Sequence, residues 1–226
     1  MYKPVNNLLV TFIAFLIIFS SCAPSRIVKP LDAKQKTIGA TFGGSLIGFG
    51  GAIIPIPFTT LYGAYGIDSS LTAFASVHTT SLAFGNFQTD FGVTKQIMKQ
   101  RGFIPAISIT PCINYIVNFK STKFNFFPQL DVNAYWNNKN GKGYAYVGID
   151  NWMDFSNEKM YGYRYQQTLL FSPQIGYTFE KKKWNFTLEC KLIAPNIDNR
   201  LSVVDYKSAL GSKGATGIFF GVLRKF

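Results

Sequence analysis

Strict alternation of apolar and polar residues is the feature that most constrains this chain. On one face of four long segments, 29 of 30 positions are non-polar or aromatic, and the exception is Gln167. These positions are the odd ones of 103–119, the even ones of 124–136, the odd ones of 165–179 and the even ones of 184–194. A period of two is typical of a β-strand, and a one-residue slip would invert both faces. The four segments are therefore predicted to be long strands of fixed register.

Weaker alternation predicts six further strands, separated from the first four by turn signals. They cover about 37–50, 58–67, 69–78, 82–97, 142–152 and 214–226. Strands joined in this way form an antiparallel meander, and a long meander closes on itself to remove its edges. The predicted fold is all-β: an up-and-down barrel of about ten strands, within a range of about eight to twelve.

Three observations predict that the apolar face points outward, into a membrane. The polar faces carry Asn, Gln, Ser and Thr with few charges, and only 15% of all residues are charged, which is low for a surface in water. The segments exceed the roughly 9–11 residues that a tilted strand needs to cross a bilayer. Aromatic residues lie near strand ends, as in the girdles of transmembrane barrels: Phe103, Phe119, Phe124, Trp136, Tyr165, Phe179 and Trp184. The alternative is a soluble barrel that encloses an apolar ligand.

Four prolines oppose a regular sheet, because each removes a donor from the ladder. They are Pro105, Pro111, Pro128 and Pro173. Local bulges are the expected solution.

The N-terminus predicts export. An apolar run of 12 residues over 8–19 is too short to span a bilayer as a helix and fits the core of a signal peptide. The following Ser20-Ser21-Cys22 resembles the lipobox of bacterial lipoproteins, which implies cleavage before Cys22 and lipidation of its thiol; Phe19 replaces the usual Leu. The predicted parts are a signal peptide over 1–21, a lipidated tether over 22–36 and a barrel domain over 37–226.

Loop lengths predict orientation. The two longest connections lie opposite the tether, as expected if they are extracellular and the tether is periplasmic. Basic residues on the tether side, Arg26 and Lys29 among them, either attract anionic headgroups or are simply solvated. The chain ends in Phe220, Val222 and Phe226, which resembles the insertion signal read by the barrel assembly machinery. The expected partners are that machinery and outer-membrane lipids.

Several stretches resemble a family of small outer-membrane β-barrel lipoproteins of Gram-negative bacteria, for which no activity is established. The resemblance covers most of the mature chain but rests on structural motifs: Trp184–Lys191, Ala194–Asn196, Val203–Lys207, Gly214–Ile218, Phe127–Asp131 and Asn133–Trp136. It implies the barrel and leaves the function open.

Two groups of residues are candidates for chemistry. His78, Ser81 and Asp205 have the residue types of a hydrolase acting on lipid at the barrel rim, and the His78–Ser81 spacing is loosely similar to that of lipid A deacylases. A lone rim histidine among hydroxyls is the simpler interpretation. The second group is a predicted polar network in the lumen that either fills the bore or forms an ion path: Asp90, Lys123, Asp131, Lys183, Glu189 and Lys191.

No motif indicates a metal site, a cofactor or nucleic-acid binding. Cys112 and Cys190 are expected to face lipid without forming a disulfide. The leading hypothesis is a non-enzymatic outer-membrane lipoprotein with a structural or adhesive role in the envelope, using the loop over 195–213. The alternatives are a narrow solute channel, a lipid A-modifying rim hydrolase and a periplasmic lipocalin-like lipid carrier.

Overall fold

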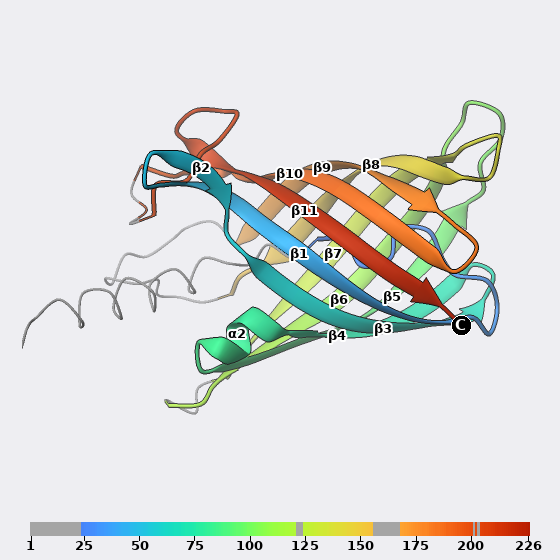
Figure 1. The fold of residues 1–226 in the computed structure, drawn as a ribbon, viewed down its shortest axis with the longest axis horizontal. Coiled ribbons are helices and arrows are strands. Elements are labelled where there is room, and N and C mark those ends of the chain that lie inside the picture. Colours follow the sequence, from blue (N-terminus) through green and yellow to red (C-terminus); the bar gives the residue numbers. More distant parts are fainter. Residues whose placement is uncertain (1–23, 121–123, 156–167, 201, 203) are drawn as a thin grey trace, which may run out of the picture.

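The chain forms a closed barrel of antiparallel strands (Figure 1). The computed structural model describes residues 24–120, 124–155, 168–200, 202 and 204–226. Its elements are β1 (Lys36–Phe49), β2 (Ala52–Pro55), β3 (Phe58–Asp68), β4 (Leu71–His78), α2 (Thr79–Ala83), β5 (Asn86–Met98), β6 (Ala106–Asn118), β7 (Phe124–Asn137), β8 (Gly143–Met153), β9 (Leu169–Glu180), β10 (Trp184–Asp198) and β11 (Lys213–Lys225). Among the described residues, no helix is long and apolar enough to cross a membrane.

Ten of these strands form the ring within the described part of the chain. Each strand from β3 to β11 pairs with its neighbour in sequence, and β1 pairs with both β3 and β11. The closing ladder runs from Thr37–Lys225 to Ser45–Gly217. The short β2 pairs only with the end of β1. The ten predicted strands and the closure are therefore confirmed; β2 and α2 are additions, and α2 occupies the start of the strand predicted over 82–97.

The two ends of the barrel differ in their connections. The loop end carries the connections 50–51, 79–85, 119–123, 154–168 and 199–212, and the turn end carries 69–70, 99–105, 138–142 and 181–183. The C-terminus lies at the turn end (Figure 1). Strands of 11 to 15 residues, except the eight-residue β4, separate the two ends.

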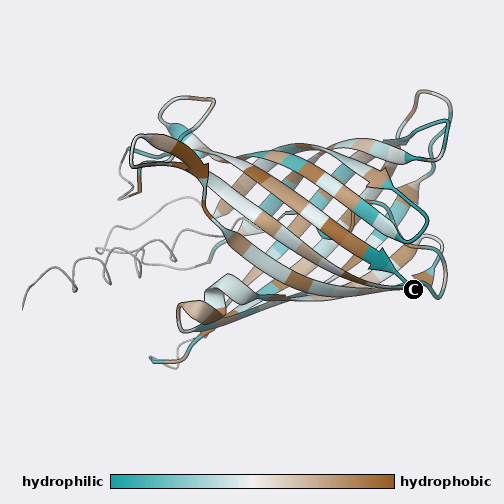
Figure 2. Ribbon diagram, in the orientation of Figure 1, coloured by the Kyte–Doolittle hydropathy of each residue, from teal (hydrophilic) through white to brown (hydrophobic). Residues whose placement is uncertain are grey.

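Apolar side chains cover the outside of the ring. Leu130 and Leu188 are 36% and 47% exposed, whereas the adjacent Asp131 and Glu189 are 5% and 1% exposed. Figure 2 shows the resulting mixture of hydrophobic and hydrophilic residues along the strands. Soluble proteins do not expose a belt of this kind. The fold is therefore a transmembrane-type barrel, and its apolar side does not line a ligand cavity.

Aromatic residues lie on the outside at both ends, as expected for interfacial girdles. Phe119 and Phe124 are exposed at the loop end, and Phe179 and Trp184 at the turn end. The guanidinium of Arg224 lies 5.6 Å from the ring centre of Trp184 and 5.0 Å from that of Phe226. This cation–π arrangement holds the charge at the edge of the apolar belt.

Large side chains fit inside because glycines face them across the ladder. Gly39 pairs with Tyr62, and Gly176 pairs with Tyr146. A Cβ atom on Gly39 would lie 2.2 Å from the ring of Tyr62, and one on Gly176 would lie 2.3 Å from that of Tyr146. The missing side chains thus make room for tyrosine rings that lie flat against the wall.

The strand prolines are accommodated without the bulges expected at them. The ladder between β9 and β10 ends at Gln174, one residue after Pro173. The ladder between β7 and β8 ends at Gln129, one residue after Pro128. At Pro111 the β5–β6 pairing is interrupted without a change of register, and Pro105 precedes β6. Each strand proline therefore lies where a neighbouring ladder has stopped or is interrupted. The register shifts occur instead near residues 66–68, 96–98 and 193–198.

Candidate functional site

Residues 24–31 lie inside the barrel and residues 32–35 lead out of it to β1; we call residues 24–35 the inner segment. The sequence predicted a lipidated tether over 22–36, and the place of residues 24–31 within the bore was not part of that prediction. Side-chain hydroxyls of three adjacent strands hold the backbone of the inner segment: Thr94 Oγ1 donates to Ile27 O at 3.0 Å, Ser108 Oγ donates to Val28 O at 2.6 Å, and Leu31 N donates to Thr72 Oγ1 at 2.8 Å. Figure 1 shows the inner segment in blue within the ring.

The inner segment leaves the bore at the turn end, where it leads into β1. Lys34 N donates to Gly66 O at 2.7 Å, and Gly66 N donates to Gln35 O at 2.9 Å. Pro24, at the other end of the inner segment, is buried. Ser25 N lies 3.3 Å from both carboxylate oxygens of Glu189, near the middle of β10. The inner segment therefore fills about the half of the bore that adjoins the turn end.

Arg26 reaches from the inner segment into a buried polar cluster. Its guanidinium forms an ion pair with Asp90, and the side chains are 4% and 0% exposed. His78 Nε2 lies 2.8 Å from Asp90 Oδ2, and His78 Nδ1 lies 3.2 Å from Thr60 Oγ1. Ser76 Oγ donates to the other oxygen of Asp90. A carboxylate with this many donors is well compensated for its burial.

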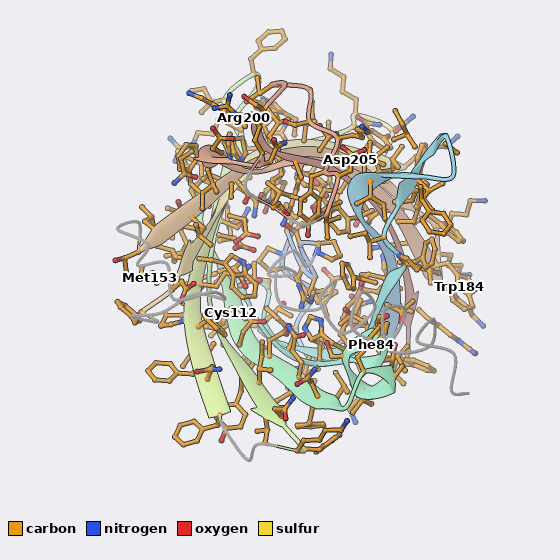
Figure 3. All side chains as sticks on the ribbon, turned by 90° about the vertical axis from the view of Figure 1, so that its left-hand side faces the viewer. Phe84, Cys112, Met153, Trp184, Arg200 and Asp205 are labelled. Atoms are coloured by element: carbon orange, nitrogen blue, oxygen red, sulfur yellow. The ribbon has the colours of Figure 1, made fainter. Side chains whose placement is uncertain are left out.

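A second cluster lies on the opposite wall. Lys191 Nζ lies 2.8 Å from Asp150 Oδ2 and 3.7 Å from Glu189 Oε1. Tyr146 OH donates to Glu189 Oε2 at 2.7 Å. Asp131 accepts from Gln129 Nε2 at 2.8 Å and stands directly opposite Asp150 in the β7–β8 ladder. Figure 3, viewed from the loop end, shows side chains filling the interior of the ring.

The structure brings four of the six predicted lumen residues into the bore: Asp90, Asp131, Glu189 and Lys191. Lys183 is exposed in the turn between β9 and β10, so its assignment to the lumen was wrong. Lys123 falls outside the described residues. Arg26 and Asp150 complete the network and were not predicted.

The three residues of the hydrolase hypothesis do not meet. His78 contacts Asp90 and Thr60, Ser81 Oγ donates to Gln88 at 2.6 Å, and Asp205 pairs with Lys207 at 2.7 Å. Asp205 is in the 199–212 connection, and its side chain is 66% exposed. Each candidate is thus engaged elsewhere, and within the described residues no serine hydroxyl hydrogen-bonds to the imidazole of His78.

Of the remaining residue predictions, some are confirmed and one is wrong. Cys190 is exposed on the outer face, as predicted, but Cys112 is buried in the lumen beside Phe74 and Tyr62, so its lipid-facing assignment was wrong. Both thiols are free. Phe220 and Phe226 are exposed on the outer surface. Cys22 falls outside the described residues. Among the described residues, no group of His, Cys, Asp and Glu could hold a metal ion.

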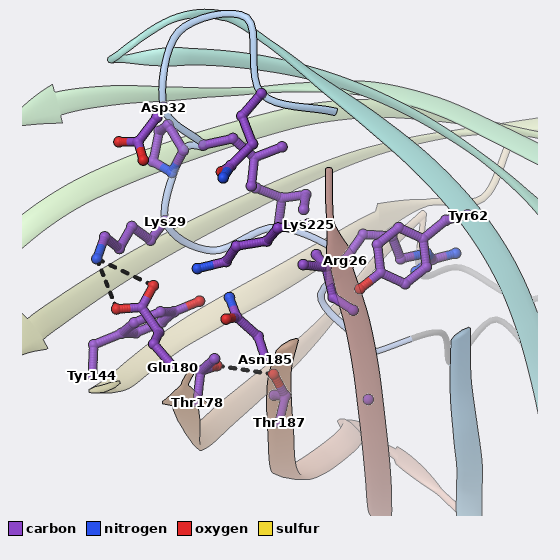
Figure 4. Close-up of a pocket in the computed structure, with 16 residues that line it drawn as sticks. Arg26, Lys29, Asp32, Tyr62, Tyr144, Thr178, Glu180, Asn185, Thr187 and Lys225 are labelled. Atoms are coloured by element: carbon purple, nitrogen blue, oxygen red, sulfur yellow. Dashed lines mark hydrogen bonds and ion pairs between the residues drawn. The ribbon is translucent and has the colours of Figure 1, made fainter. Parts of the chain in front are cut away.

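A polar cavity of about 80 Å³ lies where the inner segment meets the turn end (Figure 4). Lys29 Nζ lies 2.9 Å from Glu180 Oε2, and the Thr178 and Thr187 hydroxyls are 2.9 Å apart. Tyr144 and Lys225 also line this cavity. Its size allows only a few water molecules. The cavity is therefore a small polar pocket at the mouth of the bore.

The comparisons with known proteins add no family. No protein-family model matches the chain, and no curated protein matches it. Among solved structures, the chain is similar to a KdgM porin, with 11% identity over 85% of this chain and 99% of that one and a TM-score of 0.37. It is also similar to the translocator domain of the autotransporter NalP from Neisseria meningitidis, with 11% identity over 98% and 95% and a TM-score of 0.35. At these TM-scores the likenesses carry no argument, and the architecture rests on the strand pairing described above.

Proposed function

We propose that this protein is a non-enzymatic outer-membrane β-barrel lipoprotein that does not conduct solutes at rest and has a structural or adhesive role in the cell envelope. The single observation behind this proposal is the occupied bore: the inner segment fills the half that adjoins the turn end, and Arg26 forms a buried ion pair with Asp90. A resting channel would need a continuous aqueous path. The apolar exterior supports a place in a membrane rather than a soluble lipid carrier.

The loop end provides a folded contact surface for such a role. The 199–212 connection packs onto β1, because Gly48 N donates to Asp205 O at 3.0 Å and Lys207 N donates to Leu46 O at 2.8 Å. Val204 is buried there with side chains from β1 and the segment before β3. The tip of the β1–β2 hairpin leaves Phe49 and Ile53 each 62% exposed. Exposed apolar residues on a folded platform are typical of a contact surface.

Planar-bilayer recording tests the resting state. The purified wild-type protein is expected to produce no single-channel steps in KCl across either polarity. A general outer-membrane porin, reconstituted in the same detergent, provides the positive control. Regular steps from the wild type would overturn the proposal of a closed bore.

Cysteine labelling tests the orientation, with the loop end proposed to be extracellular. In a background with Cys112 and Cys190 replaced by Ser, Leu210→Cys places a thiol at the loop end and Lys139→Cys places one at the turn end, both at exposed positions. A membrane-impermeant maleimide is expected to label Leu210→Cys on intact cells and Lys139→Cys only after permeabilisation. The reverse pattern would overturn the orientation.

The lipid anchor is tested separately. Wild-type protein is expected to incorporate radiolabelled palmitate, and Cys22→Ser is expected to lose the label. Cys190→Ser serves as the control because that thiol is free and exposed. Equal labelling of wild type and Cys22→Ser would exclude lipidation at this position.

A further inference from the structure

We propose that the inner segment is a removable plug, and that the bore without it is a pathway for small cations. This goes beyond the closed resting state proposed above. It rests on four features of the described residues: how the inner segment is attached, the shape of the space it occupies, the charge of the walls and the hydration of the bore.

The barrel does not need the inner segment for its own closure. The ring is completed by the β1–β11 ladder, and residues 24–33 form no strand in the sheet. Between residues 26 and 31, the contacts with the wall are side-chain hydrogen bonds, the ion pairs Arg26–Asp90 and Lys29–Glu180, and apolar packing of the inner segment. The buried Arg26–Asp90 pair is the strongest kind of polar contact among them. Departure of the inner segment would therefore expose hydroxyl groups and some apolar side chains rather than a broken sheet edge, and water can satisfy the hydroxyl groups.

Small hydroxyl side chains line one side of the space that the inner segment occupies, and aromatic side chains line the rest. Thr72, Thr94 and Ser108 contact it, and Thr94 Oγ1 lies 3.0 Å from Thr110 Oγ1. An extended chain occupies roughly 5 Å by 10 Å in cross-section, as set by strand and sheet spacings. Removing the inner segment thus frees a polar slot of about that size, which is wide enough for a small hydrated cation.

The walls carry an excess of acid. Four carboxylates of the strands face the bore, and the one lysine among the described strand residues that joins them is Lys191. The carboxylates are Asp90, Asp131, Asp150 and Glu189. The inner segment offsets one of these negative charges through Arg26, and Lys29 neutralises Glu180 at the mouth. Acidic linings favour cations over anions, so the emptied slot is expected to select cations.

Buried amide groups indicate that the bore holds water. Within the part of the chain that the structure describes, Asn114 Oδ1, Asn133 Nδ2 and Gln174 Oε1 are buried without a hydrogen-bond partner. Buried polar atoms of this kind are normally satisfied by ordered water. A partly hydrated bore already provides the solvent that a permeating cation needs.

Charge reversal of the plug provides the test, because it leaves the walls unchanged. In a background with Cys112 and Cys190 replaced by Ser, Val28→Cys reports the position of the plug, since Val28 is only 3% exposed. The Val28→Cys protein is expected to resist a water-soluble maleimide. Adding Arg26→Glu and Lys29→Glu is expected to make the thiol reactive and to produce single-channel steps. In a KCl gradient, the reversal potential should shift toward the potassium equilibrium potential.

Each outcome decides the matter. A reactive thiol with a silent bilayer would overturn the cation pathway, and anion-selective steps would do the same. An unreactive thiol in a folded Arg26→Glu/Lys29→Glu variant would overturn the removable plug. Should that variant fail to fold, Thr94→Val/Ser108→Ala weakens the attachment without changing charge, and the same two measurements are made on it.

Adding Asp131→Asn/Asp150→Asn to a conducting variant should reduce its cation selectivity. Conductance by the wild type would contradict only the closed resting state.

Discussion

The two walls of the bore are both polar, yet they fill space in different ways. The wall formed by β4, β5 and β6 carries small hydroxyl residues and binds the backbone of the inner segment. The wall formed by β7 to β11 is filled by its own large side chains, among them Tyr135, Tyr146, Lys191 and Phe219, each at most 1% exposed. The first wall holds the backbone of a separate piece of chain, whereas the second is filled mainly by its own side chains and contacts that piece at Ser25 and Val28.

Because of this difference, the loss of two similar ion pairs is expected to cost different amounts of stability. Lys191–Asp150 joins two strands of the ring, so neither partner can leave without unfolding. Arg26–Asp90 joins a strand to the inner segment. The loss of Arg26 can be relieved by movement of the inner segment and entry of water, whereas the loss of Lys191 cannot.

The largest effect is expected for Lys191→Met. It leaves Asp150 and Glu189 buried without their cation, and breaking a buried pair in this way costs about 3–5 kcal/mol. Urea unfolding in detergent micelles, followed by the change in gel mobility between folded and unfolded barrel, measures the free energy. Arg224→Met is the control, since that side chain lies outside the bore. A cost under about 1 kcal/mol would show that the second cluster is hydrated.

Arg26→Met is expected to cost less, about 1.5–3 kcal/mol, which is the range for a hydrogen bond to a charged group. The same unfolding measurement applies. Adding Asp90→Asn should recover part of the loss, because the uncompensated carboxylate is then absent. If Arg26→Met were as costly as Lys191→Met, the inner segment would be as fixed as the ring.

A smaller effect is expected for Ser108→Ala, which removes the hydroxyl that donates to Val28 O. One such hydrogen bond contributes about 0.5–1.5 kcal/mol. The maleimide reaction of Val28→Cys should accelerate in this variant, while Ser70→Ala at the turn end should leave it unchanged. Equal rates in all three proteins would show that the hydroxyl wall does not hold the inner segment.

The smallest effect concerns an ion pair beyond both walls. Asp198 is the last residue of β10 at the loop end, and its hydrogen bonds with Arg200 lower its pKa to about 2. The contact should therefore be complete above the ordinary pKa of 3.8 and be lost as the pH falls through about 2. Carboxyl NMR titration should show the pKa of Asp198 rising toward 3.8 in Arg200→Ala, with no measurable change in barrel unfolding. An unchanged pKa would contradict the pairing.

The ring was predictable from sequence because its signal is repeated over many residues. Alternation over 11 or more positions identified the strands and their outward faces, and Leu130 and Leu188 lie as expected. The same periodicity places Cys112, at an even position of the segment over 103–119, with the lumen residues Ser108, Thr110 and Asn114. The error at Cys112 was therefore a misreading of a correct pattern.

The candidate site was only half predictable. Asp90, Asp131, Glu189 and Lys191 follow from strand parity, but the inner segment has no periodicity and contacts residues 41 to 164 positions away. Asp150 shares its inward face with Tyr144, Tyr146 and Trp152, so its strand has aromatic residues on the side where polar ones were expected. Lys183 follows the polar alternation of the next strand and was therefore assigned to the lumen. It lies in the turn after β9, where the alternation no longer determines the direction of the side chain.

The closed ladder between β1 and β11 has a consequence for biogenesis, because a barrel that encloses its own inner segment must assemble in a definite order. If β1 and β11 pair last, residues 24–35 must already lie within the curved sheet, and the pairing of β11 with β1 encloses them. If β1 and β11 pair first, the inner segment must pass through a lumen that already contains tyrosines and charged pairs, which is far slower. In the first route, the barrel wall forms around the inner segment.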